Sequence, residues 1–150
     1  MSQVQRFSAA ALLAFTRDAL SSCGVPAADA EIAAKQMIEA DLTGFDAHGV
    51  FRLNAYVTTL KSGRTNTKAN IRPIHRSAAT AVVDGDNGIG HLVMTYCANL
   101  AIELARQSGV GRLVTPRATT PSRAVCWWRT STVPTPATAA TRVPPNSWTR

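Results

Sequence analysis

The chain has 150 residues, of which 45% are hydrophobic, so its composition fits one folded domain and argues against a disordered or membrane-spanning protein. Its net charge of +7 arises mainly after residue 111, because residues 1–111 contain ten Lys or Arg and nine Asp or Glu. The odd number of three widely spaced cysteines, Cys23, Cys97 and Cys126, argues against a disulfide framework or zinc knuckle, and we expect a cytoplasmic protein.

Three helices with short connections are predicted in residues 1–63, which we take as a helical N-terminal segment. Ser8 is a good cap for the first helix, and Gly24 is placed to end it. Pro26 suits the first turn of the second helix, which Gly44 ends. The expected inward-facing residues are Leu12, Phe15, Ala19 and Leu20 in the first helix, and Ala30, Ala33, Ala34, Met37 and Ile38 in the second.

A third helix is predicted to follow Asp46, whose carboxylate can accept hydrogen bonds from free backbone N–H groups. Its inner stripe is expected to contain Leu53, Tyr56, Val57 and Leu60, and Ser62–Gly63 ends it.

The pattern changes after residue 63, and residues 64–114 are predicted to begin an α/β catalytic domain. Residues 71–74 suit a short extended segment, and residues 80–84 are rich in strand-forming side chains. A turn at 85–88 leads into a helix over 91–106, and Leu113–Val114 begins another strand. Residues 85–90 lack the Gly-x-Gly-x-x-Gly spacing of a dinucleotide loop, so a turn that needs glycine at positive φ is favoured. The apolar face of the helix contains Val93, Cys97, Leu100, Ala101 and Leu104.

The segment 115–150 has a different composition, with nine Thr, six of the eight Pro, all three Trp, and Arg as its only charged residue. We therefore expect an irregular tail that is disordered or arises from a shifted reading frame in GC-rich coding sequence. Its Arg and Trp residues also allow weak nucleic-acid binding as a minor alternative.

The most informative stretch is Ala40–Leu53, which contains His48 and Arg52 four residues apart. On a helix both side chains share one face. This pair suits the reduction of a 2-oxoacid, because a histidine can donate a proton to the developing alkoxide and an arginine can hold the substrate carboxylate through two hydrogen bonds. A solvated helix face explains the same two residues. His75 and His91 have no partners at ligand spacing, so no metal site is predicted.

The stretch resembles the malate/L-lactate dehydrogenase family, which also includes ureidoglycolate, sulfolactate and 2,3-diketogulonate reductases. The resemblance covers residues 7–111 and only the N-terminal part of that family's pattern. The matching features are Ala40-Asp41, Gly44, His48-Gly49-Val50 and Arg52, then Tyr56, Leu60, Gly63, Asn66 and Ala69, then Val83-Asp84-Gly85-Asp86 and Gly88-Ile89-Gly90, and finally Ala101-Ile102, Ala105 and Gly109-Val110-Gly111.

The resemblance implies an NAD- or NADP-dependent oxidoreductase that exchanges a hydride with a small 2-oxoacid or 2-hydroxyacid, as a homodimer. It implies that His48 is the catalytic proton donor, and we assign Arg52 to substrate binding. The implied fold is a mixed sheet that is not a Rossmann fold, and no cofactor-binding residue is assigned.

The sequence departs from the family pattern at two places: Ala47 replaces a more usual Ser, and the family's second His is absent after residue 111. We therefore expect a truncated enzyme, in which the 150-residue chain alone has little or no reductase activity. The alternative is an inactive fragment that associates through its helices.

Overall fold

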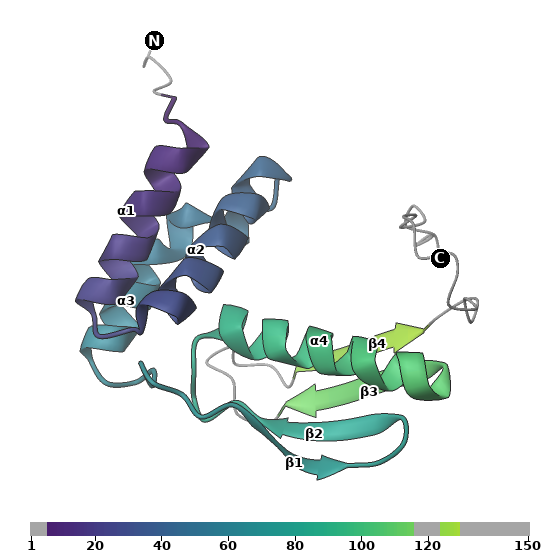
Figure 1. Cartoon of the computed structure of the whole chain (residues 1–150). Coiled ribbons are helices and arrows are strands. Elements are labelled where there is room, and N and C mark those ends of the chain that lie inside the picture. The colour runs from purple at the N-terminus through teal and green to yellow at the C-terminus, as the bar shows by residue number, and fades with distance from the viewer. Residues whose placement is uncertain (1–5, 116–123, 130–150) are drawn as a thin grey trace.

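The structure is a computed structural model that describes residues 6–115 and the strand at 124–129. A group of helices is followed by one mixed sheet with a long helix packed on it (Figure 1), which confirms the predicted α/β class and its helical N-terminal segment. Two 3₁₀ turns, η1 and η2, lie between the second and third helices. The elements are α1 (Ala9–Ser22), α2 (Ala27–Leu42), η1 (Asp46–His48), η2 (Val50–Arg52), α3 (Leu53–Lys61), β1 (Arg72–Arg76), β2 (Thr80–Asp84), α4 (Gly90–Ser108), β3 (Val110–Thr115) and β4 (Ala124–Arg129).

Helix α1 begins as predicted, since Ser8 Oγ accepts a hydrogen bond from the N–H of Ala11 at 3.2 Å. Its predicted inner face is only partly right. Leu20 is buried, but the side chain of Phe15 is 61% exposed and Thr16 is fully buried. Because α1 packs mainly against α2, the position after Phe15 takes the inward direction.

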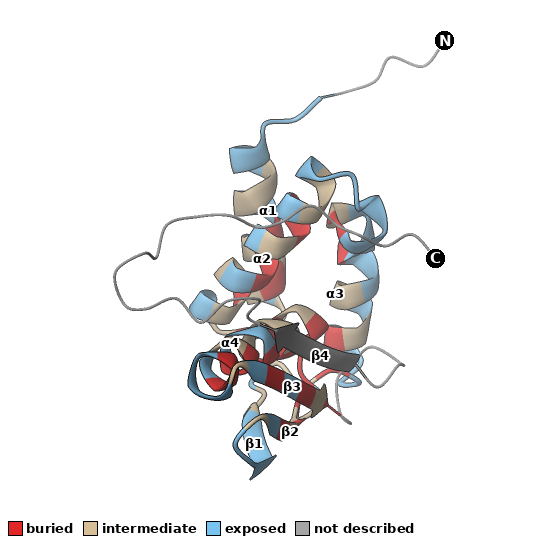
Figure 2. Cartoon of the chain, turned by 90° about the vertical axis from the view of Figure 1, so that its right-hand side faces the viewer, coloured by how far each residue is buried: buried red, intermediate tan, exposed pale blue. Residues whose placement is uncertain are grey.

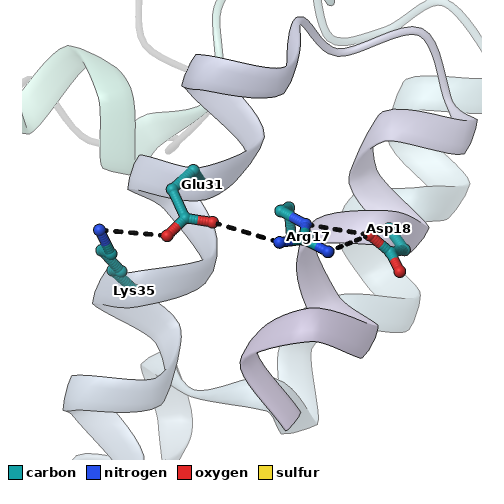
Figure 3. Close-up of polar contacts among 4 residues, drawn as sticks. All are labelled: Arg17, Asp18, Glu31 and Lys35. Carbon is teal, nitrogen blue, oxygen red and sulfur yellow. Dashed lines mark hydrogen bonds and ion pairs between the residues drawn. The ribbon is translucent and has the colours of Figure 1, made fainter. Parts of the chain in front are cut away.

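Polar contacts also connect α1 with α2 at the surface (Figure 3). Arg17 forms an ion pair with Asp18 at 2.9 Å and reaches Glu31 of α2 at 4.0 Å, while Lys35 contacts Glu31 at 3.1 Å. Partly exposed pairs of this kind contribute about 0–1 kcal/mol each. The packing of the two helices therefore depends chiefly on their buried apolar residues.

The hydrophobic core has two parts (Figure 2). One lies among α1, α2, α3 and the start of α4, and the other lies between α4 and the sheet. The predicted inner faces of α2 and α4 are confirmed, because every residue named for them is buried. Cys97 packs in the second core and Cys23 packs against the first, as expected for small apolar residues.

The sheet has the order β1-β2-β3-β4. β1 pairs with β2 in antiparallel orientation, and β2 pairs with β3 in parallel through the crossover helix α4. β4 pairs antiparallel with β3, with Val110 opposite Arg129 and Thr115 opposite Ala124. This strand lies inside the segment that composition predicts to be irregular. The rest of residues 116–150 lies outside the described residues, so the boundary at residue 114 and the shifted reading frame stay predictions.

Gly111 allows α4 to lie directly on β3. A Cβ atom at this position would stand 2.1 Å from the backbone oxygen of Ala101 in α4, a separation that real atoms do not adopt. Since the crowding atom belongs to the helix backbone, no side-chain movement relieves it.

Gly111→Ala is expected to lower the free energy of unfolding by about 3 kcal/mol, because the added methyl group pushes α4 away from β3. Urea denaturation followed by circular dichroism measures the change. Arg112→Ala, at the exposed neighbouring position, serves as the control and is expected to change stability by about 0.5 kcal/mol or less. Equal effects of the two substitutions would contradict this role of Gly111.

The turn between β2 and α4 corrects one prediction. Its left-handed residues are Asp86, at φ 46°, and Asn87, at φ 53°, and not its glycines. Asp and Asn tolerate this conformation better than other non-glycine residues. Gly88 is needed for space instead, since a Cβ atom there would lie 2.6 Å from the Cβ of Ala69. The Asp86 carboxylate also accepts hydrogen bonds from Asn66 and from the backbone N–H of Asn70, which fastens the loop after α3 to this turn.

Candidate active site

Residues 45–52, which we call the His48 turn, do not form the predicted helix capped by Asp46. They form η1 and η2, separated by Gly49 in an extended conformation at φ −84° and ψ −161°. The residue before η1 is Phe45, and no side chain caps η1. The prediction is wrong because it used local helix signals alone, whereas a residue of α2 holds this turn.

That residue is Asp41, in the last turn of α2. Its Oδ2 accepts a hydrogen bond from the backbone N–H of Val50 at 3.0 Å. A Cβ atom on Gly49 would stand 1.5 Å from Oδ1 of the same carboxylate. Glycine at position 49 therefore lets the carboxylate reach the start of η2. This role of Asp41 was not predicted from the sequence, although Asp41 shares the family-like motif with His48-Gly49-Val50.

His48 ends η1 and its side chain is exposed. It borders an open groove of about 500 Å³, which we call the His48 groove. Because Asp41 accepts a hydrogen bond from the N–H of Val50, two residues after His48, the turn that carries His48 is tied to α2. The residues that line the groove are Gln36, Glu39, Ala40 and Thr43 of α2, with Phe45 and His48.

Arg52 ends η2 and is also exposed. Its guanidinium lies near the phenol of Tyr56: burial raises the pKa of Tyr56, and the positive charge of Arg52 lowers it by a smaller amount. No hydrogen bond joins His48 to Arg52 among the described residues. His48 and Arg52 are thus both exposed, in successive 3₁₀ turns, without a direct hydrogen bond between their side chains.

His91, in the first turn of α4, is a third residue of this region and was given no role from the sequence. Its ring centroid lies 5.3 Å from that of Tyr56, with the planes at 60°. Burial lowers the pKa of the imidazole, a hydrogen bond with the backbone of His48 raises it by less, and the charge of His48 lowers it. His91 therefore contacts the helix that follows Arg52 through the ring of Tyr56.

The turn between β2 and α4 does not fit a dinucleotide phosphate. The turn before α4 offers no open cradle, because Gly88, Ile89 and Gly90 are buried in the protein interior. Among the described residues no group of three or more His, Cys, Asp or Glu side chains is arranged for a metal ion. No described helix has the length and apolarity needed to cross a membrane.

Comparisons with known proteins agree with the resemblance. The sequence profile of the malate/L-lactate dehydrogenase family matches residues 7–131. L-Sulfolactate dehydrogenase of Methanocaldococcus jannaschii is 45% identical over 101 residues, which cover 67% of this chain and 29% of that enzyme. Malate dehydrogenase of Pyrococcus horikoshii is 39% identical over 103 residues, which cover 69% of this chain and 29% of the enzyme.

Solved structures show the same fold. The malate dehydrogenase structure from Pyrococcus horikoshii OT3 superposes with a TM-score of 0.73 at 34% identity, over 79% of this chain and 35% of that chain. Sulfolactate dehydrogenase from Methanocaldococcus jannaschii gives a TM-score of 0.72 at 40% identity, over 74% of this chain and 32% of that chain.

The mixed α/β fold is that of part of the malate and sulfolactate dehydrogenase structures. The chain belongs to the malate/L-lactate dehydrogenase family. It spans about 29% of the length of the curated relatives it matches.

Proposed function

We propose that this chain supplies the proton donor and the carboxylate-binding residue for the interconversion of a small 2-oxoacid and its 2-hydroxyacid. The observation that carries the proposal is the exposed His48 beside an open groove, on a turn that Asp41 fixes to α2. Membership of the family supports it, and implies a nicotinamide cofactor, NAD or NADP, as the carrier of the hydride.

His48 acts on the carbonyl oxygen of the substrate. As the carbonyl carbon is reduced, negative charge develops on this oxygen, and the protonated imidazole transfers its proton there. In the reverse direction the neutral imidazole accepts the hydroxyl proton. A fixed turn is useful because a proton donor is effective only within hydrogen-bond reach of the reacting oxygen.

Arg52 holds the carboxylate of the substrate. Its planar guanidinium presents two parallel N–H donors to the two carboxylate oxygens, which fixes both the position and the plane of the acid. Since η2 directly follows η1, His48 and Arg52 are close in the chain, which supports one substrate shared by the two side chains. The turn between β2 and α4 offers no open phosphate cradle, so no residue is assigned to hold the cofactor.

The homodimer is also part of the proposal. Three large apolar side chains near the His48 turn face solvent: Leu42 is 73% exposed, Phe45 67% and Phe51 83%. Large exposed apolar side chains are a usual feature of protein interfaces, so these three support an association of two copies. No observation in the described residues favours nucleic-acid binding, and the side chains of the Arg- and Trp-containing tail lie outside them.

The test uses a segment-exchange enzyme, in which residues 7–115 of this chain replace the matched segment of the malate dehydrogenase of Pyrococcus horikoshii. Oxidation of NADH and NADPH is followed by absorbance with a panel of 2-oxoacids. We expect oxidation that depends on the oxoacid. A folded exchange enzyme that oxidises neither cofactor with any oxoacid would contradict the proposal.

In the same enzyme Arg52→Lys is expected to raise KM for the 2-oxoacid roughly tenfold with little change in kcat, because one charge-assisted hydrogen bond of the bidentate pair is lost. Arg64→Lys, at an exposed position after α3, is the matched control and should leave KM unchanged. A fall in kcat at constant KM would show that Arg52 does not bind the substrate carboxylate.

A further inference from the structure

The α2 side of the His48 groove is lined by residues that share one face of the helix. Gln36, Glu39, Ala40 and Thr43 border the groove, and they recur three or four positions apart, the spacing that lines residues up along a helix. We call these four residues the α2 wall. From Gln36 to Thr43 the chain rises about 10 Å along the helix axis, so the wall is long enough to contact a substrate side chain of several carbon atoms.

Hydrogen bonds fix the orientation of the Gln36 amide. Oγ1 of Thr95 in α4 donates its single proton to the backbone carbonyl of His91 at 2.7 Å. The same oxygen must therefore accept a hydrogen bond from Gln36, which places the amide NH₂ of Gln36, and not its carbonyl, toward Thr95. Oε1 of Gln36 has no hydrogen-bond partner among the described residues. Gln36 thus adds a free acceptor to the α2 wall.

Thr43 also presents an acceptor. Its hydroxyl donates to the backbone carbonyl of Glu39 at 2.7 Å and lies 3.2 Å from that of Ala40. The only proton of this hydroxyl is therefore used within the end of the helix, and the lone pairs of Oγ1 remain for a ligand.

Glu39 gives the α2 wall its charge. Its side chain is exposed and forms no ion pair within the described part of the chain. Glu31 on the same helix differs, because it contacts Lys35 at 3.1 Å and Arg17 at 4.0 Å (Figure 3). No Lys or Arg lines the groove. The wall therefore contains three acceptors, one of them negatively charged, and no positive charge of its own.

We propose that the α2 wall selects a 2-oxoacid or 2-hydroxyacid whose side chain ends in a cation that donates hydrogen bonds, an amino or a guanidino group. Such a group has donors and no acceptor, so it matches the three acceptors of the wall. The exposed ring of Phe45, which also lines the groove, adds a surface that attracts cations. The inference rests on the proposed function, which places the carbonyl of the substrate at His48 and its carboxylate at Arg52.

A second acidic group is disfavoured by the same wall. A carboxylate or sulfonate at the end of the substrate would be an acceptor facing acceptors, and it would meet the charge of Glu39 with no Lys or Arg in the groove lining to offset it. Malate and sulfolactate, which the names of two relatives contain, carry such a group. We therefore expect this chain to differ from those relatives in the acid that it prefers, within the same class of reaction.

The experiment uses the full chain and needs no hydride transfer. Three 2-hydroxyacids, namely 2-hydroxy-5-guanidinopentanoate, 2-hydroxypentanoate and malate, are titrated while the backbone amide signals are followed by NMR. Agmatine, which has the guanidino group and no carboxylate, is the fourth probe. We expect the guanidino acid and agmatine to shift the signals of residues 36–43, and 2-hydroxypentanoate and malate to leave them in place.

The variant that isolates the charge is Glu39→Gln, which keeps the shape of the side chain. It is expected to weaken binding of the guanidino acid about two- to fivefold, the range of an exposed ion pair. Glu31→Gln, on the same helix and outside the groove lining, is the matched control and should leave this affinity unchanged.

Two results would overturn the inference. One is malate shifting residues 36–43 as strongly as the guanidino acid does, and the other is equal affinity of Glu39→Gln and the wild type for the guanidino acid. Shifts at residues 48–52 that all three hydroxyacids share would in either case leave the proposed function standing. Guanidino-dependent shifts at residues 36–43, without any shift at residues 48–52, would instead overturn the proposed binding of the carboxylate by Arg52 alone.

Discussion

Replacing His48 by alanine in the segment-exchange enzyme is expected to lower kcat roughly 10²- to 10⁴-fold, the usual contribution of a general acid. KM for the 2-oxoacid should change far less, because the proton is transferred in the transition state and the carboxylate is bound elsewhere. Steady-state absorbance assays at saturating cofactor measure both constants.

The matched control for this substitution is His75→Ala, since His75 is exposed on β1, outside the proposed site. It is expected to leave both constants within about twofold of the wild type, a difference below 0.5 kcal/mol. If kcat of His48→Ala equals that of the control, His48 is not the proton donor.

Gly49→Ala is expected to lower the free energy of unfolding of the full chain by about 2–3 kcal/mol. The conformation of Gly49, at φ −84°, is open to any residue, so the effect comes from the contact of the new methyl group with Asp41, whose Oδ1 would be 1.5 Å away. Asp41→Ala alone should cost about 1.5–3 kcal/mol, because the N–H of Val50 loses its charged acceptor.

A double-mutant cycle separates this contact from a general weakness of the turn. The double variant Asp41→Ala with Gly49→Ala is expected to lose about 1 kcal/mol or more less stability than the two single losses add up to. The reason is that Asp41→Ala removes the carboxylate that the new methyl group at position 49 would contact. Gly44→Ala is the control: Gly44 is at φ 81° with nothing within 4 Å, so Asp41→Ala should not relieve its strain. Additive effects at Asp41 and Gly49 would contradict the contact.

The elements that periodicity defines were predictable. The face of α2 and the face of α4 are buried as expected, because a helix that packs on one side repeats its apolar residues at a fixed spacing. α1 was less predictable because it is covered mainly by one neighbour, and the sequence does not tell which of the adjacent positions Phe15 and Thr16 faces that neighbour.

The site was predictable in its residues and less so in its geometry. The motif led to His48 and Arg52, and both side chains are exposed. The two 3₁₀ turns that carry them depend on the hydrogen bond from the N–H of Val50 to Asp41 and on the absence of a side chain at Gly49. Both features are contacts between α2 and the His48 turn, which local helix signals do not contain. His91 was not predictable, because its contact with Tyr56 exists only once α4 lies against the helical segment.

The hydrogen bond from Val50 to Asp41 has a further consequence for how such a segment can change during evolution. Both ends of the bond lie within one short continuous stretch of the chain, so recombination or gene fusion on either side transfers it intact. Insertions between α2 and η2 are the changes that would separate its two ends. The groove-lining residues Gln36 and Glu39 lie before this stretch, outside the segment that carries the bond.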